Sequence, residues 1–533
     1  MSQAQIGVES QLTTKNPVTL GLVAVFLITF LGSLITYGFN IAMPMIAADL
    51  KGMALYSWAI SLPALAAAFV TLLFGKFSDM YGRRAMLMVS LVFFIIGAVL
   101  CALSRTFEFN IAARIIWALG FGALAALCAS VIGDMYAPAE RSKWTGLLAI
   151  PAGIAATVGP ILVGTITDRL SWRAYFWALV PVAVVCAIFV MIGIPSRKER
   201  TGHKIDYTGA CLLLIASSSM ILGVSFADRH PWISFSVLGL LAVSVVFWCL
   251  SVWAEEPIID PQVFTNRTVL TAAVAALLSF FGFIGILNYY PLFLQGVQGT
   301  NATISGQMLT PFSMLMAFLG VPAGFLLAKT KRYKWMYILG YAILTIAMFG
   351  MVTFSAGTPL WLGVLVTALA GLGTGAIPTV NTLVVQFAVP RRLLGMAVAA
   401  IFFIVLIGNA IAPAVLGSVM NSIYEKKLRY SLPAELSQLM DEATLASIAD
   451  PRVLMSPEAM TGLRNTFNKA GEEAPAFFDQ TVRAIRGALE SSLKRLFLIG
   501  AVTMLLSFLF ILTIPEVSMD VEVQDKRAGI SCP

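Results

Sequence analysis

Long apolar runs recur along almost the whole chain, and they constrain its fold more than any other feature. A helix that crosses the hydrocarbon core of a bilayer needs about 20 predominantly apolar residues. Only 12% of the 533 residues are charged, about half the share found in soluble domains. Fourteen runs are long enough to cross a membrane: about 18–46, 56–75, 85–104, 109–135, 145–167, 174–194, 207–226, 232–253, 269–289, 304–328, 335–354, 359–386, 396–422 and 494–514. The sequence therefore predicts an all-α, polytopic membrane protein with fourteen transmembrane helices.

The positive charges between these runs fall mainly on one side of the predicted membrane. An even number of spans places both termini on the same side, and cytoplasmic loops are enriched in Lys and Arg. With the N-terminus inside, the inner segments carry nineteen Lys and Arg residues and the short outer loops carry five. This bias predicts a multi-pass protein of the plasma membrane with both termini in the cytoplasm.

Short glycine and proline patterns of the first half recur about 250 residues later. The Gly-x-Gly-Ala sequence at 120–123 recurs at 373–376, and the proline-centred stretch at 159–164 has a counterpart at 412–417. Spans 1–6 and 9–14 are therefore predicted to be two six-helix pseudo-repeats, with spans 7 and 8 inserted between them. Internal repeats of this kind are typical of transporters whose binding site lies between the repeats.

These patterns divide the chain into eight predicted segments. They are a cytoplasmic tail at 1–17, an N-terminal six-helix bundle at 18–194, a cytoplasmic linker at 195–206, two inserted helices at 207–253, helices 9–13 of the C-terminal bundle at 269–422, a long outer loop at 423–492, helix 14 at 493–515 and a cytoplasmic tail at 516–533. Apolar residues recur at helical spacing in the long outer loop, which predicts amphipathic helices on the outer face. A tolerated insertion is the favoured interpretation of this loop, and a lid over the outer mouth is the alternative.

A charged turn between the second and third spans has a specific pattern. It reads Gly75-Lys-Phe-Ser-Asp79-Met-Tyr-Gly82-Arg83-Arg84. The glycines allow a tight turn between helices, and the charges crowded there need partners or water. A Gly-x-x-x-Asp-x-x-Gly-Arg-Arg loop between two spans resembles the signature loop of the major facilitator superfamily.

Four further stretches of the first half, and one of the second, extend the resemblance to the 14-helix drug-antiporter branch of that superfamily. They are Asn40 to Leu50, Arg114 with Gly120 and Gly122, Gly159-Pro160 with Gly164, Leu170 to Arg173 with Phe176 and Pro181, and Tyr290 to Gln295. The resemblance implies export of hydrophobic, often cationic, compounds in exchange for protons.

The resemblance also implies roles for two groups of residues. Asp79, Arg83 and Asp134 would form a charge chain that locks the outward-open state, with a purely structural clamp as the alternative. The residues Gly159, Pro160 and Gly164 would form a bend in span 5. That bend either seals the leak path between the two halves or only allows close packing.

The chain departs from the family pattern where proton coupling is concerned. The family usually places an aspartate in the first span at the position of Ile35, and every Asp and Glu of this chain lies outside the middle of the predicted spans. Acids within spans are the usual proton relays. Proton antiport is therefore expected from the resemblance, and the residues argue partly against it.

Arg114 is the one formal charge that the sequence places inside a span. Trp117 and Phe121 follow three and seven residues later and share its helical face. Tyr37 and Asn40 have similar spacing on the first span, so these five residues are predicted to line a central cavity. Three interpretations of Arg114 stay open: it binds an anionic or hydrogen-bond-accepting substrate, it modulates a proton site, or it braces the first and fourth spans.

The sequence lacks a phosphate-binding loop, a catalytic triad pattern and a metal-ligand cluster. The expectation is a protein that is not an enzyme, takes no cofactor or metal, binds no nucleic acid and works as a monomer in the lipid bilayer. The expected function is secondary export of amphiphilic small molecules, with protons as the coupling ion. The alternatives are an uncoupled carrier of a specific metabolite or lipid, and a membrane sensor or scaffold that has lost transport.

Overall fold

The computed structural model describes residues 15–135, 144, 147–195, 233–252, 265–330, 332–389, 394–432, 454–455, 457–469 and 477–515, together with scattered positions between 212 and 226. In this described part of the chain, all regular secondary structure is helical. The predicted all-α fold is therefore confirmed. Residues 1–14 and 516–533 of the predicted tails, most of the linker at 195–206 and much of span 7 lie outside the described residues, and residues 15–17 of the first tail are already helical.

Six long helices form a first set in the N-terminal half. They are α2 (Lys15–Asp49), α3 (Tyr56–Tyr81), α4 (Arg83–Ala102), α5 (Phe107–Met135), α7 (Ala149–Arg169) and α8 (Trp172–Gly193). A single residue, Gly82, separates α3 from α4, and its φ of 91° lies in a region that side chains disfavour. Glycine is the residue that this turn requires, as the sequence pattern predicts.

A second set follows in the C-terminal half. It comprises α12 (Arg267–Ile284), η2 (Gly285–Tyr289), α13 (Tyr290–Leu292), η3 (Phe293–Val297), α14 (Ala302–Thr330), α15 (Lys334–Val352), α16 (Leu360–Gly375), α17 (Ile377–Ala388), α18 (Leu394–Ser431) and α22 (Phe478–Leu512). The segments from α12 to η3 form one apolar rod that is π-helical over η2 and η3. Such π-helical turns are rare and occur often at functional sites.

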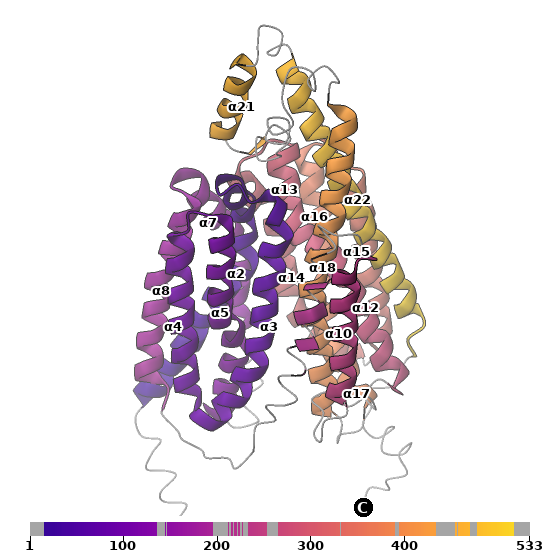
Figure 1. Cartoon of the computed structure of the whole chain (residues 1–533). Helices are drawn as coiled ribbons and strands as arrows, with labels where there is room; N and C mark the ends of the chain where they lie inside the picture. Colours follow the sequence, from indigo (N-terminus) through magenta and orange to yellow (C-terminus); the bar gives the residue numbers. More distant parts are fainter. Residues whose placement is uncertain are drawn as a thin grey trace, which may run out of the picture.

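The two sets pack by the same pattern (Figure 1). Helix α2 contacts α5, α7 and α8, and its counterpart α12 contacts α18 and α22. Helix α5 lies against α3 and α4, and α16 lies likewise against α14 and α15. The sets are joined by α7 with α14 and by α3 with α18. Apart from the contact of α2 with α5, exchanging the two sets maps these contacts onto one another, as expected for a pseudo-repeat.

Within the described residues, ten helices are long and apolar enough to cross a membrane, and Phe235–Trp248 and Leu360–Gly375 are shorter apolar helices. The count of fourteen spans stays a prediction. Helix α10 (Phe235–Val252) covers predicted span 8, and the Ser244 hydroxyl donates a 2.8 Å hydrogen bond to the carbonyl of Ala216 in span 7. The inserted segments therefore contact one another.

The helices on either side of the long outer loop extend further than the apolar runs. Helix α18 continues to Ser431 and α22 begins at Phe478, whereas the prediction ended one run at 422 and began the next at 494. The extensions are amphipathic: Leu428, Ile485 and Leu489 are buried although charged residues surround them in sequence. A third helix, α21 (Pro457–Lys469), lies beyond the bundle at the same end (Figure 1). The rest of the loop lies outside the described residues.

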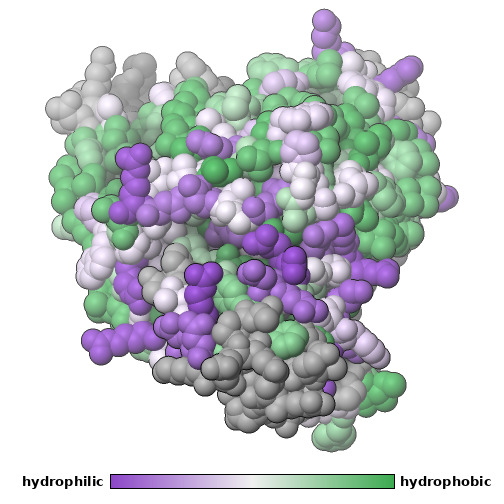
Figure 2. Space-filling view, turned by 90° about the horizontal axis from the view of Figure 1, so that it is seen from above, coloured by the Kyte–Doolittle hydropathy of each residue, from purple (hydrophilic) through white to green (hydrophobic). Residues whose placement is uncertain are grey.

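The surface has the distribution that a membrane protein requires. Large apolar side chains are exposed along the flanks of several helices, including Val92, Ile96, Val245 and Leu509. Figure 2 looks onto the end that carries α21; hydrophilic residues gather across the middle of this face, and hydrophobic residues dominate much of its rim. We call this end, where α2 finishes, the Asp49 end, and the opposite end, where α3 turns into α4, the Gly82 end.

Candidate functional site

Arg114 is buried inside the first set of helices, near the Asp49 end. Its side chain on α5 is 5% exposed, and it is the only charged residue among the buried side chains of the described chain. Its Nη1 atom donates a 3.4 Å hydrogen bond to the sulfur of Met43, and its guanidinium carbon lies 4.2 Å from the ring centroid of Phe39. Its Nε atom is buried without a hydrogen-bond partner.

Aromatic side chains from three helices, α2, α5 and α8, pack around Phe39, whose ring contacts this guanidinium. The Phe39 ring lies 5.7 Å from Trp117, 6.3 Å from Tyr175 and 6.1 Å from Phe176, measured between centroids. Trp117 in turn stacks on Phe121 at 6.2 Å. The indole Nε1 of Trp117 and the hydroxyl of Tyr175 are buried and lack hydrogen-bond partners. The cluster is therefore apolar except for a few polar atoms with unused hydrogen-bonding capacity.

The helical face of α2 that meets Arg114 differs from the one that the sequence suggested. Phe39 and Met43 are four residues apart and make the contacts with Arg114. Tyr37 and Asn40 are half-buried on the same helix, but they lie away from that face, because successive residues turn by about 100°. Their place in a shared cavity with Arg114 stays a prediction. Phe39, Met43 and Tyr175 were not found by the sequence argument.

Polar contacts join the two sets of helices at the Asp49 end. The Tyr56 hydroxyl donates a 3.0 Å hydrogen bond to the carbonyl of Asn288 in η2. The Gln295 amide in η3 donates a 3.1 Å hydrogen bond to the carbonyl of Ile41 in α2. Tyr56 also packs against Tyr289, with ring centroids 5.8 Å apart. The two π-helical segments thus supply the surface on which this end closes. Asn288 and Gln295 are polar residues in an apolar run, a signal visible in the sequence.

Asp168 forms a second contact between the sets. This carboxylate at the end of α7 accepts hydrogen bonds from the backbone amides of Ala302 and Thr303, at 3.1 and 2.7 Å, and from the Thr303 hydroxyl at 2.5 Å. The amides belong to the first turn of α14, where a negative charge is favourable because free N–H groups point outward. Asp168 therefore caps a helix of the opposite set. We call these contacts the Asp168 clasp.

The predicted bend in α7 lies where this helix packs most closely on α14. A Cβ atom added at Gly164 would lie 2.5 Å from the carbonyl oxygen of Ala302, and one at Gly306 would lie 2.2 Å from that of Pro160. Both distances are shorter than a side chain allows. Gly159 instead lies against α2, where a Cβ at Gly38 would be 3.0 Å from its carbonyl oxygen.

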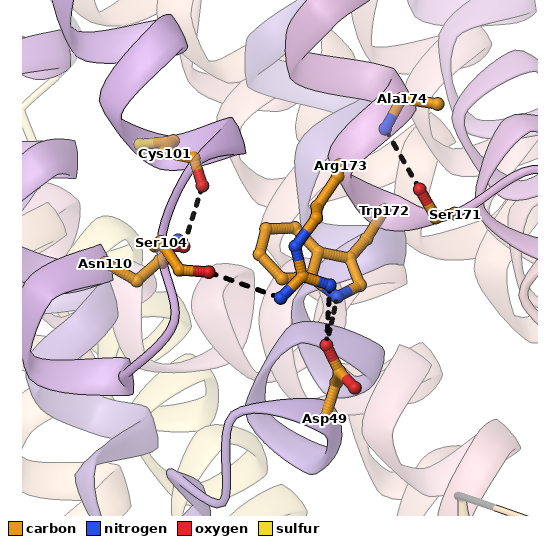
Figure 3. A network of polar contacts seen from close by, with 8 residues as sticks. All are labelled: Asp49, Cys101, Ser104, Asn110, Ser171, Trp172, Arg173 and Ala174. Atoms are coloured by element: carbon orange, nitrogen blue, oxygen red, sulfur yellow. Dashed lines mark hydrogen bonds and ion pairs between the residues drawn. The ribbon is translucent and has the colours of Figure 1, made fainter.

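A network of polar contacts ties together four helix ends of the first set (Figure 3). Asp49 accepts hydrogen bonds of 2.9 Å from Trp172 Nε1 and from Arg173 Nη1, and Arg173 Nη2 donates to the carbonyl of Ser104 at 3.2 Å. The Ser104 hydroxyl accepts from Asn110 at 2.9 Å. These residues include two of the stretches that carry the family resemblance, and their role here is to hold α2, α4, α5 and α8 in register.

The predicted switch residues lie at the Gly82 end. Arg83 donates a hydrogen bond to Ser78, and Arg84 is half-buried. Gly75 and Asp79 belong to α3 and Asp134 to α5, but these side chains lie outside the described residues. The charge chain among Asp79, Arg83 and Asp134 stays a prediction. Within the described residues, no group of three or more His, Cys, Asp or Glu side chains could hold a metal ion.

The sequence resembles known transporters over most of its length. The model of the Major Facilitator Superfamily matches residues 25–413. The multidrug transporter protein MdtP of Bacillus subtilis is 27% identical over 492 residues, which cover 90% of this chain and 89% of that protein. Multidrug resistance protein 3 of the same organism is 27% identical over 481 residues, with 88% and 90% covered.

Solved structures share the fold. A bacterial homolog of the human lysosomal transporter Spinster, in an inward-facing and unoccupied conformation, matches with a TM-score of 0.60 at 17% identity, covering 95% of this chain and 100% of that one. A peptide transporter POT in complex with sulfate matches with a TM-score of 0.57 at 13% identity, covering 87% and 95%. The helix packing and the Gly82 turn agree with the match over residues 25–413. The chain therefore belongs to the major facilitator superfamily.

Proposed function

We propose that the protein is a secondary exporter of amphiphilic compounds that works by alternating access. The observation that carries this proposal is the character of the closure at the Asp49 end. The two sets meet there through a few polar contacts, Tyr56 to Asn288, Gln295 to Ile41 and the Asp168 clasp. Contacts of this kind can form and break as rigid bundles rock against one another. The relatives whose names describe multidrug transport and efflux support export.

The charge bias of the loops supports an orientation in the membrane. We take the Asp49 end to face outward and both termini to lie in the cytoplasm, as this bias favours, and we propose that the protein works as a monomer in the plasma membrane. In that orientation the structure corresponds to the state that is closed to the outside. Breaking the Asp168 clasp and the Tyr56 contact would open the outer path, and the charge chain predicted among Asp79, Arg83 and Asp134 at the Gly82 end would then lock this outward-open state.

We further propose that export is coupled to protons. Asp168 is a carboxylate whose hydrogen bonds join the two sets, so loss of its negative charge would weaken the closure directly. Coupling at the outer closure would replace the mid-span aspartate of the family pattern, because Ile35, at that position, is 4% exposed and packs in the core.

An uncoupled carrier of a specific metabolite or lipid is the second candidate function. The buried Ile35 favours it, because an aliphatic side chain at that position cannot carry a proton. The two candidates make opposite predictions about the response to a pH gradient, and a sensor that has lost transport predicts no movement of substrate at all.

Transport by purified protein in proteoliposomes separates these candidates. A panel of fluorescent amphiphiles that are cationic, neutral or anionic is offered with and without an imposed pH gradient. Uphill movement with proton counterflow supports coupled export, and equilibration that ignores the gradient supports the carrier. Asp168→Asn keeps a side-chain acceptor but removes the negative charge, so it should abolish the response to the gradient. Asp479→Asn, on the surface of α22, is the matched control.

A further inference from the structure

Arg114 is a buried cation for which the described residues supply no counter-ion. Its guanidinium contacts a thioether and an aromatic ring, which are weak partners for a charge. Burying an unpaired charge costs several kcal/mol even after relaxation. The acids of α5 lie elsewhere: Glu108 is exposed, and Asp134 follows twenty residues later, about 30 Å along the helix axis. Arg114 therefore needs an acceptor from outside its own shell.

The other unpaired polar atoms of this shell are also hydrogen-bond donors. They are Trp117 Nε1 and the Tyr175 hydroxyl, together with Nε of Arg114 itself. An indole and a guanidinium can only donate hydrogen bonds, and a phenol can donate one. Apart from the Met43 sulfur and the Tyr175 oxygen, which are weak or neutral acceptors, the polar atoms of this shell are donors, a composition that favours an anion. Hydrogen bonds from such donors to an anionic oxygen are short and about twice as strong as neutral ones.

The surroundings of these donors suit the apolar part of an amphiphile. Phe39, Phe94, Phe121 and Phe176 all pack on Trp117. An aromatic wall alone would accept a cation through its ring faces, but a guanidinium among the rings repels a second positive charge. The charge of Arg114 therefore selects against cations at this place.

The cluster lies next to the closure between the two sets. Tyr56, whose hydroxyl is bonded to Asn288 of the second set, lies close enough to Arg114 to interact with its charge. Met43 and Phe39 belong to α2, the helix that Gln295 contacts from the second set. A rearrangement of the contacts between the two sets would therefore move Tyr56 and α2, which directly neighbour Arg114.

We propose that Arg114, Trp117 and Tyr175 bind the anionic head group of an acidic amphiphile, a carboxylate, sulfonate or phosphate, whose apolar body packs against the phenylalanine rings. The inference names the substrate class of the exporter proposed above and rests on that function. It also separates this chain from an exporter built for cationic compounds.

Binding to the wild-type protein is the direct test. Protein in phosphatidylcholine nanodiscs is equilibrated by dialysis against three probes with one apolar body: pyrenebutyrate, pyrenebutanol and a pyrenebutyl trimethylammonium salt. Empty nanodiscs correct for partition into lipid. The carboxylate should bind about tenfold more tightly than the alcohol, as expected for charge-assisted hydrogen bonds. Equal binding of the three probes, or preference for the cation, overturns the proposal.

Variants assign the preference to the site. Arg114→Gln should reduce carboxylate binding to the level of the alcohol, whereas Arg105→Gln, which removes an exposed cation near the same end, should leave it unchanged. Tyr175→Phe removes one donor and keeps the ring, and Trp117→Phe removes one donor and keeps a smaller aromatic ring, so each should weaken carboxylate binding by roughly threefold and change alcohol binding less. These two variants carry the test if Arg114→Gln does not fold. Preserved charge preference in both ring variants and in Arg114→Gln would contradict the assignment.

Two further arms identify the source of the anion. Acetate and phosphate at millimolar concentration should displace pyrenebutyrate poorly, because they lack the apolar body. Efficient displacement would overturn the amphiphile in favour of a small free anion. Nanodiscs with added phosphatidylglycerol should bind the probe as before, and competition by this lipid would assign the site to a lipid head group instead. If pyrenebutyrate binds but is not transported, the proposed export is refuted and this inference stands. If the protein transports its substrates without a preference for anions, this inference is refuted and export stands.

Discussion

The two sets of helices pack alike but treat a matching position differently. Gly120 and Gly373 are related by an offset of 253 residues. By the same offset, Thr367 of α16 is the equivalent of Arg114 of α5 in the second half. Thr367 is fully buried, and its hydroxyl lies 2.9 Å from the carbonyl oxygens of both Met308 and Gly363. In the C-terminal half this position is therefore a hydroxyl with hydrogen-bond partners. In the N-terminal half it is a charged group without a counter-ion among the described residues. Buried polar atoms without partners occur in both halves, but the only buried charge of the described residues, Arg114, lies in the N-terminal half.

The backbone differs in the opposite sense. Helix α2 is α-helical from Lys15 to Asp49, whereas its counterpart passes through two π-helical segments. Those segments offer the Asn288 carbonyl to Tyr56 and direct Gln295 toward α2. If the protein works as proposed, the first half would supply recognition chemistry and the second an adaptable closing surface. Each of the following predictions tests one part of that division.

Removal of the charge in the N-terminal half should have the largest effect. Arg114→Met replaces the guanidinium by a shorter, unbranched and uncharged side chain and should lower the transport of acidic amphiphiles by about 100-fold, since one buried charge-assisted contact stabilises by up to about 3 kcal/mol. Thr367→Val removes the matching hydroxyl in the second half and should change transport less than about twofold. Initial rates in proteoliposomes with equal amounts of folded protein measure both. Equal losses would mean that the halves do not differ in recognition.

The joint between α7 and α14 should be the next most sensitive place. Gly306→Val adds atoms within 2.2 Å of the Pro160 carbonyl oxygen and must push the two sets apart at the Asp49 end. Transport should fall by at least about tenfold, as expected when a close helix contact is lost. Gly239→Val on α10 is the control, because a Cβ there meets nothing within 4 Å. Accessibility of a cysteine at Thr303 to a membrane-impermeant reagent should rise in Gly306→Val, and unchanged labelling would argue against a closed joint.

The Gly82 turn offers a third comparison, since the corresponding loop of the second half has Ala328 in place of Asp79. Asp79→Asn removes the charge that only the first half carries and should lower transport by about fivefold, the loss expected for one charge-assisted hydrogen bond of modest strength. Binding of pyrenebutyrate should stay intact, because the site lies at the other end of the bundle. A variant that transports normally would remove the switch from the account of the cycle.

The sequence predicted the helices well because each must be long and apolar to cross a bilayer, a requirement that leaves a direct mark on composition. It also identified Arg114, because a charge inside an apolar run stands out. It could not place Phe39 and Met43 beside that charge. Helix α2 is surrounded by α5, α7 and α8, so its sequence has no polar face from which its rotation could be inferred. The helical extensions beyond 422 and before 494 were missed for a related reason: they are amphipathic, and an apolar criterion ends too early.

The smallest effect concerns the turns that follow the first helix of each set. Lys51 after α2 has a φ of 57°, and Gly299 after η3 has a φ of 69°, so matching turns use a conformation that costs a side chain about 1 kcal/mol. Lys51→Gly should raise the apparent melting temperature by roughly 2 °C, and Gly299→Ala should lower it by a similar amount. A Cβ at Gly299 meets nothing within 4 Å, so its effect reports the backbone alone. The measurement is the temperature at which the monomer peak is lost in fluorescence-detected gel filtration. Melting temperatures that shift in opposite directions in the two variants would show that the halves share the geometry of this turn. Shifts of the same sign would exclude the shared geometry.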